Sequence, residues 1–258
     1  MITFKVNGKQ LEYSGNPDSD LLSFLRNELH LTAAKDGCSG EGVCGACTVH
    51  INGKARLACR TKIGSLNNAE IVTLEGLETY RKEVLAKTMI NHGAVQCGFC
   101  TPGFIMKADI LLRDNPKPVL EEVQKGLKSN ICRCTGYKKI ENAILEAADH
   151  FQNNQEVDLI TTTGKLGEPQ PKYGAYETAL GERKFVADYY FEDMGFAALK
   201  FSDYPKAKIL KINTKEAENL EGVWGVFTAK DIPGSQIIGL IRQDWWLMIG
   251  EGDTTHYI

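Results

Sequence analysis

Eight cysteines are the residues of this chain whose types and spacing best suit chemistry, and none of them falls after position 134. The first eight residues lack the charged and long apolar regions of a secretion signal, and disulfides are rare in reducing compartments. We therefore expect metal binding rather than disulfide pairing. The cysteines are Cys38, Cys44, Cys47, Cys59, Cys97, Cys100, Cys132 and Cys134.

The first four cysteines have the spacing C-x5-C-x2-C-x11-C, with three in one glycine-rich loop, residues 36–47. Glycine tolerates positive φ and lets backbone N–H groups approach bridging sulfides. Four-cysteine sites of this plan hold a [2Fe–2S] cluster. Structural zinc is the alternative, but zinc ribbons usually use two C-x2–4-C pairs and this loop has one. The spacing favours iron–sulfur.

The last four cysteines have the spacing C-x2-C-x31-C-x-C. The first pair lies in the segment Gln96–Gly103, where Thr101 and Pro102 are expected to be the N-cap and first residue of a helix. The positive field of a helix N-terminus suits thiolates. The second pair stands between two predicted helices, and its C-x-C spacing is too tight for common zinc knuckles. Iron–sulfur is again favoured.

Short strands and one helix are predicted to position the first four cysteines. Asn7-Gly8 and Asn52-Gly53 each predict a tight hairpin turn. An apolar helical face runs from Leu21 to Leu29, with Asp18 or Ser19 as its cap. These elements predict a small α+β sheet domain. The expected strands are residues 2–6, 10–13, 48–51, 55–59 and 70–74.

Four helices are predicted to position the last four cysteines, and together they make a compact bundle. His92-Gly93 ends the first helix, where His92 is expected to interact with the helix dipole rather than bind a metal. The expected helices are residues 80–91, 102–113, 119–128 and a last one that runs to about His150.

A polar stretch rich in glycine and proline, residues 152–172, predicts an extended linker. A helix at residues 215–220, capped by Thr214, and four strands are expected after it. The predicted domains are residues 1–76, 77–151 and 173–258, separated by this linker. The four strand candidates are residues 184–190, 196–201, 207–212 and 223–227.

The composition is that of a soluble globular protein, with 43% apolar and 24% charged residues among 258. A net charge of −3 gives no reason to expect nucleic acid or an anionic membrane surface as a partner. No apolar run approaches the roughly 18 residues of a membrane span. We therefore expect a cytoplasmic protein.

The cysteine sets and their flanking residues resemble the iron–sulfur portion of the molybdenum hydroxylases, the xanthine dehydrogenase and aldehyde oxidoreductase family. The similarity covers about the first 150 residues and is highly specific, because it includes both spacings. It implies an α+β fold: a β-grasp plant-type ferredoxin domain, a four-helix [2Fe–2S] bundle and a partial α/β domain of the molybdopterin-binding portion. The segments that carry it are Gly37–Thr48, Gln96–Gly103 and Cys132–Tyr137.

A weaker resemblance to the opening of the molybdenum-binding portion follows the linker. The chain departs from it at Ser202–Ala207, where relatives often carry a Ser-Pro-x-x-His-Ala-like segment. Because family members continue for several hundred residues, we expect this chain to be truncated and to lack the molybdenum active-site residues. We assign no catalytic residue. The matching segments are Tyr173–Gly181, Ala187-Asp188, Ala207–Ile209, Gly222-Val223 and Val226–Gly234.

The resemblance implies electron transfer through two [2Fe–2S] clusters from a molybdenum–pterin centre that hydroxylates purines, N-heterocycles or aldehydes. The cluster on Cys97, Cys100, Cys132 and Cys134 is the expected first acceptor. The cluster on Cys38, Cys44, Cys47 and Cys59 then passes electrons outward. About 20 residues separate the two family portions, too few for a flavin domain. FAD, if used, is therefore expected on a separate flavin subunit, and the molybdenum cofactor mainly on another chain or a missing C-terminal portion.

Two residues are implied to contact the molybdopterin: Gln96 through its amide, and the ligand Cys134. Without the family, Gln96 is more simply a hydrogen-bonded turn residue. Arg133 is equally well explained as a surface charge. Two other functions stay open for the chain, a stand-alone ferredoxin-like electron carrier and a module with structural zinc. Residues 173–258 argue against the carrier, which needs no such domain.

Overall fold

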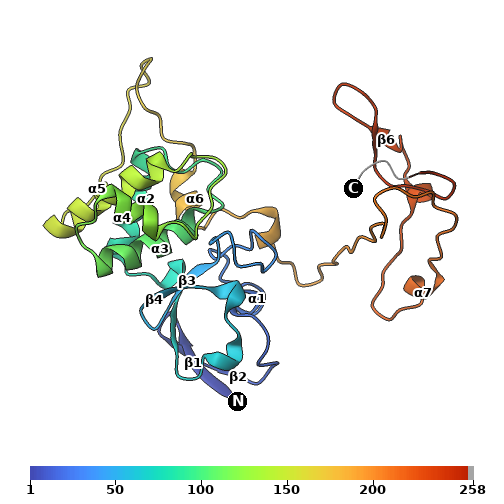
Figure 1. The fold of residues 1–258 in the computed structure, drawn as a ribbon, viewed down its shortest axis with the longest axis horizontal. Helices are drawn as coiled ribbons and strands as arrows, with labels where there is room; N and C mark the ends of the chain where they lie inside the picture. Colours follow the sequence, from blue (N-terminus) through green and yellow to red (C-terminus); the bar gives the residue numbers. More distant parts are fainter. Residues whose placement is uncertain (255–258) are drawn as a thin grey trace. The chain divides into compact units, whose positions relative to one another are not determined.

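The computed structural model of the protein describes residues 1–254. The chain forms two units, residues 1–189 and residues 190–258 (Figure 1). The first unit contains both predicted cysteine sets. No helix among the described residues is long and apolar enough to cross a membrane.

The first unit opens with a mixed five-stranded sheet of order β2-β1-β5-β3-β4. β1 and β5 are parallel, and the other neighbouring strands are antiparallel. Both predicted hairpins are confirmed: φ is positive at Asn7, Gly8, Asn52 and Gly53, as a tight two-residue turn requires. The strands are β1 Ile2–Val6, β2 Lys9–Tyr13, β3 Thr48–Ile51, β4 Lys54–Leu57 and β5 Glu70–Val72.

An aromatic cluster fills the core beneath this sheet. The ring of Phe24 packs edge-on against Phe4 and Tyr13, with centroids 5.7 Å and 5.3 Å away. Phe24 stands where α1 (Leu21–Ser23) continues as a wider π-helix, Phe24–Glu28. The predicted cap was wrong: Asp20 accepts the Ser23 N–H at 2.9 Å.

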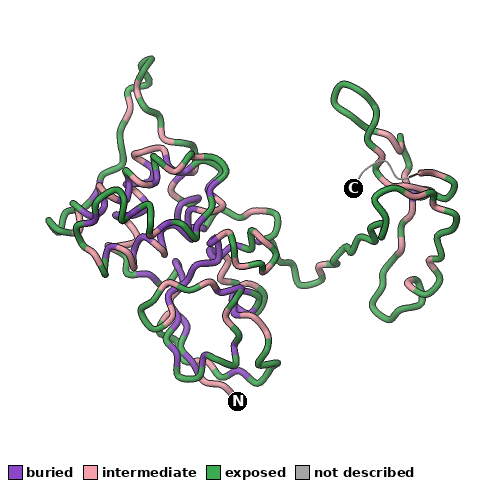
Figure 2. The backbone as a smooth tube through the Cα atoms, viewed as in Figure 1, coloured by how far each residue is buried: buried purple, intermediate pink, exposed green. Residues whose placement is uncertain are grey.

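Four helices form the bundle that follows, as predicted (Figure 1). Their buried faces make one core, and the buried part of the chain runs through the inside of the bundle in Figure 2. The starts predicted for the first three helices each differ from the observed ones by one residue. The helices are α2 Thr79–Asn91, α3 Thr101–Asp114, α4 Leu120–Gly126 and α5 Lys138–Asn153.

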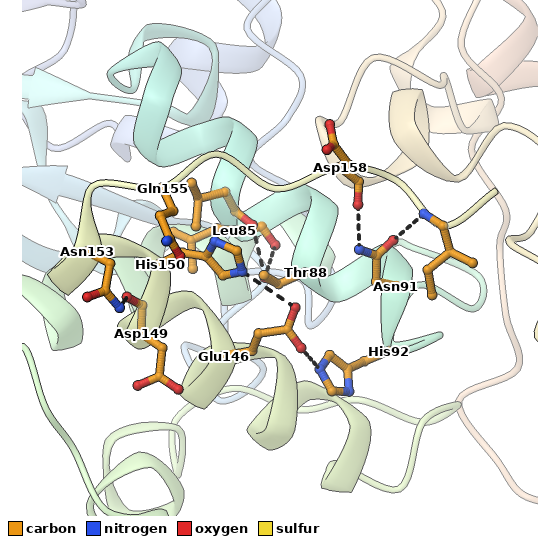
Figure 3. Close-up of polar contacts among 12 residues, drawn as sticks. Leu85, Thr88, Asn91, His92, Glu146, Asp149, His150, Asn153, Gln155 and Asp158 are labelled. Atoms are coloured by element: carbon orange, nitrogen blue, oxygen red, sulfur yellow. Dashed lines mark hydrogen bonds and ion pairs between the residues drawn. The ribbon is translucent and has the colours of Figure 1, made fainter.

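Polar contacts tie the end of α2 to α5 and to the chain after it (Figure 3). His92 follows α2, and its Nε2 lies 2.6 Å from the Glu146 carboxylate on α5. Asn91 donates to the backbone oxygen of Asp158 at 2.8 Å and accepts the Ile160 N–H at 3.1 Å. His92 therefore interacts with a side chain, Glu146, as well as lying at the end of α2, where interaction with the helix dipole was predicted. The first part of the predicted linker is bound to the bundle.

A buried ion-pair network in the bundle lies beside the hydrogen bond that joins the sheet to the bundle. The Asp109 side chain on α3 is 0% exposed and forms ion pairs with Arg81 and Arg113. His50 on β3 lies beside it, with Nε2 2.7 Å from the Met106 backbone oxygen. Burial lowers the pKa of His50. The imidazole is therefore neutral at pH 7, and its Nε2–H donates to that oxygen.

The second unit contains little regular structure between residues 190 and 254. Its elements are α7 Lys215–Glu218, the 3-10 turn Ala229–Asp231 and the strands β6 Ile237–Ile238 and β7 Trp245–Trp246. Helix α7 follows Thr214, as predicted, although the Thr214 side chain makes no capping bond.

The four strands predicted after the linker were wrong. Residues 196–201, 207–212 and 223–227 form no strand, and 184–190 contains the 3-10 turn Val186–Asp188. A strand requires a neighbour for its backbone groups, and within residues 190–254 these segments find only one isolated bridge, Lys208 to Thr254. The alternation of apolar and polar side chains in these segments resembles a strand, but it does not provide a neighbouring strand to pair with.

We expect Asp109→Ala to lower the free energy of unfolding by about 3 kcal/mol, because it leaves the Arg81 charge uncompensated at a buried position. Chemical unfolding followed by circular dichroism measures the change. Asp114→Ala, at the exposed end of the same helix, is the control, with an expected change within about 0.5 kcal/mol. Equal losses in the two variants would contradict a role for the network.

Candidate metal centres

The first cysteine set gathers around the loop 36–47. Cys59 approaches it because β4 ends at Leu57, earlier than predicted, and the Ala58 N–H bonds the Cys47 backbone oxygen at 3.1 Å. The four thiols act on one another electrostatically: Cys38 and Cys44 affect each other's pKa, and the pKa of Cys47 responds to Cys59, Cys44 and Cys38.

Glycines shape this loop in two ways. Gly40, Gly42 and Gly45 have positive φ, as the loop's glycine content predicts. Gly37 has ordinary φ but no room: a Cβ there would lie 3.1 Å from the Cys44 sulfur and 3.2 Å from the Phe99 ring. The backbone therefore packs directly against the thiols.

Burial dominates the electrostatics of the first set. It raises the pKa of Cys44 and Cys47, and raises that of Cys59 to about 12. For Cys38, hydrogen bonds from the Val43 and Cys44 N–H groups outweigh burial, and its pKa is lowered. Buried thiols become thiolates only with a strong local positive charge, which a bound metal supplies.

The second cysteine set joins the start of α3 to the turn between α4 and α5. Its thiols also act on one another electrostatically: the pKa of Cys97 responds to Cys134 and Cys132, and that of Cys100 to Cys132 and Cys97. Cys100 itself is the N-cap residue of α3, so the predicted cap Thr101 is instead the first helical residue.

One member of the second set is prepared for ligation by its surroundings. The Thr135 hydroxyl donates to the Cys132 sulfur at 3.1 Å. This bond and the N–H groups of Cys134 and Thr135 outweigh burial, and the pKa of Cys132 is lowered. Burial raises the pKa of Cys97 and Cys100.

Cys97 and Cys134 form the exposed edge of the second set. Gln96 is also exposed, and its side-chain amide donates to the Gly93 backbone oxygen at 3.0 Å. The Lys172 ammonium donates to the Gln96 backbone oxygen at 2.6 Å. Arg133 is exposed on the turn. The residues implied to contact a pterin therefore share one accessible edge.

Four thiols in each set fit a binuclear cluster, in which each iron takes two thiolates. Within residues 1–254, no three His, Cys, Asp or Glu side chains converge as ligands of a single ion. An all-sulfur donor set is typical of iron–sulfur and zinc sites. Both sets have the donor number and type that a [2Fe–2S] cluster requires.

Two hydrogen bonds join the segments that carry the two cysteine sets. The Ile131 N–H bonds the Cys44 backbone oxygen at 2.8 Å, and the Asn130 amide donates to the Gly45 backbone oxygen at 3.1 Å. Gly103 on α3 permits this approach, since a Cβ there would lie 2.5 Å from the Gly45 oxygen. Asn130 was not predicted as a functional residue. The only feature of the sequence that could have indicated it is its place two residues before Cys132.

Three family models match the chain. A 2Fe-2S iron-sulfur cluster binding domain matches residues 12–90, and a [2Fe-2S] binding domain matches residues 73–145. The a/b hammerhead domain of aldehyde oxidase and xanthine dehydrogenase matches residues 180–257. The protein therefore contains two [2Fe–2S]-binding domains followed by a region similar to the hammerhead domain.

Known proteins resemble the chain over two different extents. It is 42% identical over 153 residues to the nicotinate dehydrogenase small FeS subunit of Eubacterium barkeri, covering 97% of that subunit and 59% of this chain. It is 35% identical to the aldehyde oxidoreductase of Megalodesulfovibrio gigas, covering 92% of this chain and 27% of the relative.

A solved structure gives the same result for the fold. The aldehyde oxidoreductase of Desulfovibrio desulfuricans matches with a TM-score of 0.83 and 37% identity, over 92% of this chain and 27% of that one. The chain thus spans about a quarter of the aldehyde oxidoreductases and nearly all of the nicotinate dehydrogenase small subunit. With the α+β fold and both cysteine sets, the chain belongs to the xanthine dehydrogenase and aldehyde oxidoreductase family of molybdenum hydroxylases.

Proposed function

We propose that this chain carries electrons from a molybdenum–pterin centre through two [2Fe–2S] clusters to an outside acceptor. The gathering of the eight cysteines into two sets of four, each within a segment that a [2Fe-2S] domain model matches, is the observation that carries the proposal. Each cluster, when bound, accepts and donates one electron at a time. The ligands are Cys38, Cys44, Cys47 and Cys59 for the first cluster, and Cys97, Cys100, Cys132 and Cys134 for the second.

The chain's own residues connect the two sites by a short route. From Cys44, the route follows its backbone oxygen and one hydrogen bond to Ile131, whose neighbour is Cys132. Asn130 is 2% exposed and fastens the same contact through Gly45. These residues hold the two thiol sets at a fixed separation, which any transfer between them requires.

The exposed edge of the second set is the side on which the pterin is proposed to bind. Gln96 and Cys134 lie on it, and the Gln96 amide has a turn partner that a ligand can compete with. The molybdenum cofactor and the residues that act on substrate are proposed to lie mainly outside this chain. Flavin, if used, is proposed on a separate subunit. Purines, N-heterocycles and aldehydes are the proposed substrate classes.

Iron content and electron paramagnetic resonance (EPR) spectra of anaerobically purified protein test the clusters directly. We expect about four irons per chain and, after dithionite, two distinct rhombic signals, because the two thiol sets differ in exposure and hydrogen bonding. A colourless protein that contains zinc would contradict the proposal. Co-purification with a molybdenum-containing chain distinguishes this function from that of a free electron carrier.

Cys134→Ser is expected to remove one EPR signal and keep the other, since it takes one thiolate from the second set alone. Cys59→Ser is the matched variant, expected to remove the opposite signal. Circular dichroism establishes that both variants fold. If either substitution abolished both signals in a folded protein, the assignment of two independent sites would be wrong.

A further inference from the structure

Residues 174–188, called the clasp below, follow the linker but belong to the first unit. The clasp contains the short helix α6, Ala175–Ala179, and the 3-10 turn Val186–Asp188. The hammerhead-domain model matches the chain from residue 180, yet the first unit extends to Tyr189. The structural boundary therefore lies about ten residues beyond the start of the family match. The intervening residues contact the cysteine-bearing domains.

The apolar part of the clasp packs against the Cys97–Cys100 turn and the bundle. Ala175, Ala179 and Leu180 are buried in the core of the bundle. The methyl group of Thr178 rests on Gly98, where an added Cβ would lie 1.9 Å from it. Gly98 also has a positive φ of 84°. The Cys97–Cys100 turn and the clasp are therefore closely packed against each other at Gly98.

The charged part of the clasp is one carboxylate between two cations. Asp188 Oδ1 accepts from Arg26 Nη2 at 2.8 Å, and Oδ2 accepts from the Lys35 ammonium. The side chains of Lys35 and Asp188 are each only 1% exposed. Asp188 also accepts the Phe185 N–H at 2.9 Å, which closes the turn. A buried ion pair of this kind leaves an uncompensated charge when one partner is removed.

The ring of Phe185 connects the charged part to the cysteines. It lies 5.2 Å from the Lys35 ammonium and packs edge-on against Phe99, with centroids 5.2 Å apart. Phe99 stands between Cys97 and Cys100 and also approaches Gly37 in the first cysteine loop. Displacing Phe185 would therefore expose a ring that touches both cysteine loops.

We propose that Asp188 is a positioning residue. By neutralising Lys35 and Arg26, it fastens the clasp. The clasp holds the Cys97–Cys100 turn in place and shields its Gly98 and Phe99 side from water, whereas Cys97 stays exposed. One residue, Tyr189, separates the clasp from the second unit, so Asp188 also fixes where the chain leaves the iron–sulfur domains. The effect on a cluster rests on the proposed function, whereas the fastening of the clasp does not.

Asp188→Asn in the full chain tests the fastening, because it keeps the side-chain shape and removes the charge. Hydrogen exchange of the amides at 174–188 is expected to accelerate about tenfold or more, since Lys35 is left buried and unpaired. The α2 and α5 amides report whether the domains stay folded. Asp18→Asn, which removes the same charge from an exposed pair with Lys62, is the control and is expected to change nothing.

Redox titration followed by EPR tests the shielding. A more hydrated site favours the more negatively charged reduced cluster, so the midpoint potential of the second cluster is expected to rise. Phe185→Ala separates hydration from charge, since it keeps the ion pair and removes the ring. It should raise the same potential and leave the potential of the first cluster less affected.

Unchanged exchange in Asp188→Asn would overturn the fastening of the clasp. Faster exchange with unchanged potentials in both variants would overturn the shielding. If Asp188→Asn failed to fold, the midpoint potential of the second cluster in Phe185→Ala would decide the shielding. Hydrogen exchange of amides 174–188 in Phe185→Ala would decide whether the ion pair suffices to hold the clasp, and these amides are expected to stay protected. Absence of clusters in the unmodified chain would refute the proposed function and leave the exchange result interpretable.

Discussion

Four thiols held close together in a protein interior are stable as ligands only when positive charge compensates them. Burial raises the pKa of most of these cysteines, and Cys59 reaches about 12. Where the pKa is lowered, at Cys38 and Cys132, backbone N–H groups or the Thr135 hydroxyl point at the sulfur. The loops depend on this constraint: they need glycines so that backbone can approach, and rigid surroundings so that the thiols stay together.

The rigid surroundings come from three places in the chain. The sheet and the bundle are joined by the hydrogen bond from His50 to the Met106 backbone oxygen and by the contact between Gly45 and Asn130. The clasp adds a third connection from beyond the linker. The second set keeps one exposed edge, at Cys97 and Cys134, whereas Cys47 and Cys59 of the first set are buried.

Local signals predicted most of the first unit. Asn-Gly pairs have one strongly preferred hairpin geometry, and the helical periodicity of the bundle is long enough to be unambiguous. The four strands after the linker failed because a strand is defined by its partner, which no single segment encodes. The Asp188 ion pairs and the Asn130 contact also could not be predicted from the sequence. Each joins residues far apart in the chain, and neither has a spacing pattern.

The hydrogen bonds between the two cysteine loops also constrain how the protein is assembled. The Asn130 amide meets the Gly45 oxygen across a separation of 85 residues, so the first loop acquires this support only after α2, α3 and α4 exist. Closing so long a loop is slow compared with forming the Asn-Gly hairpins. During synthesis, all residues of the first cysteine loop are therefore present well before the loop can adopt its final conformation. The loop gains its full set of contacts only once the second half of the first unit has emerged.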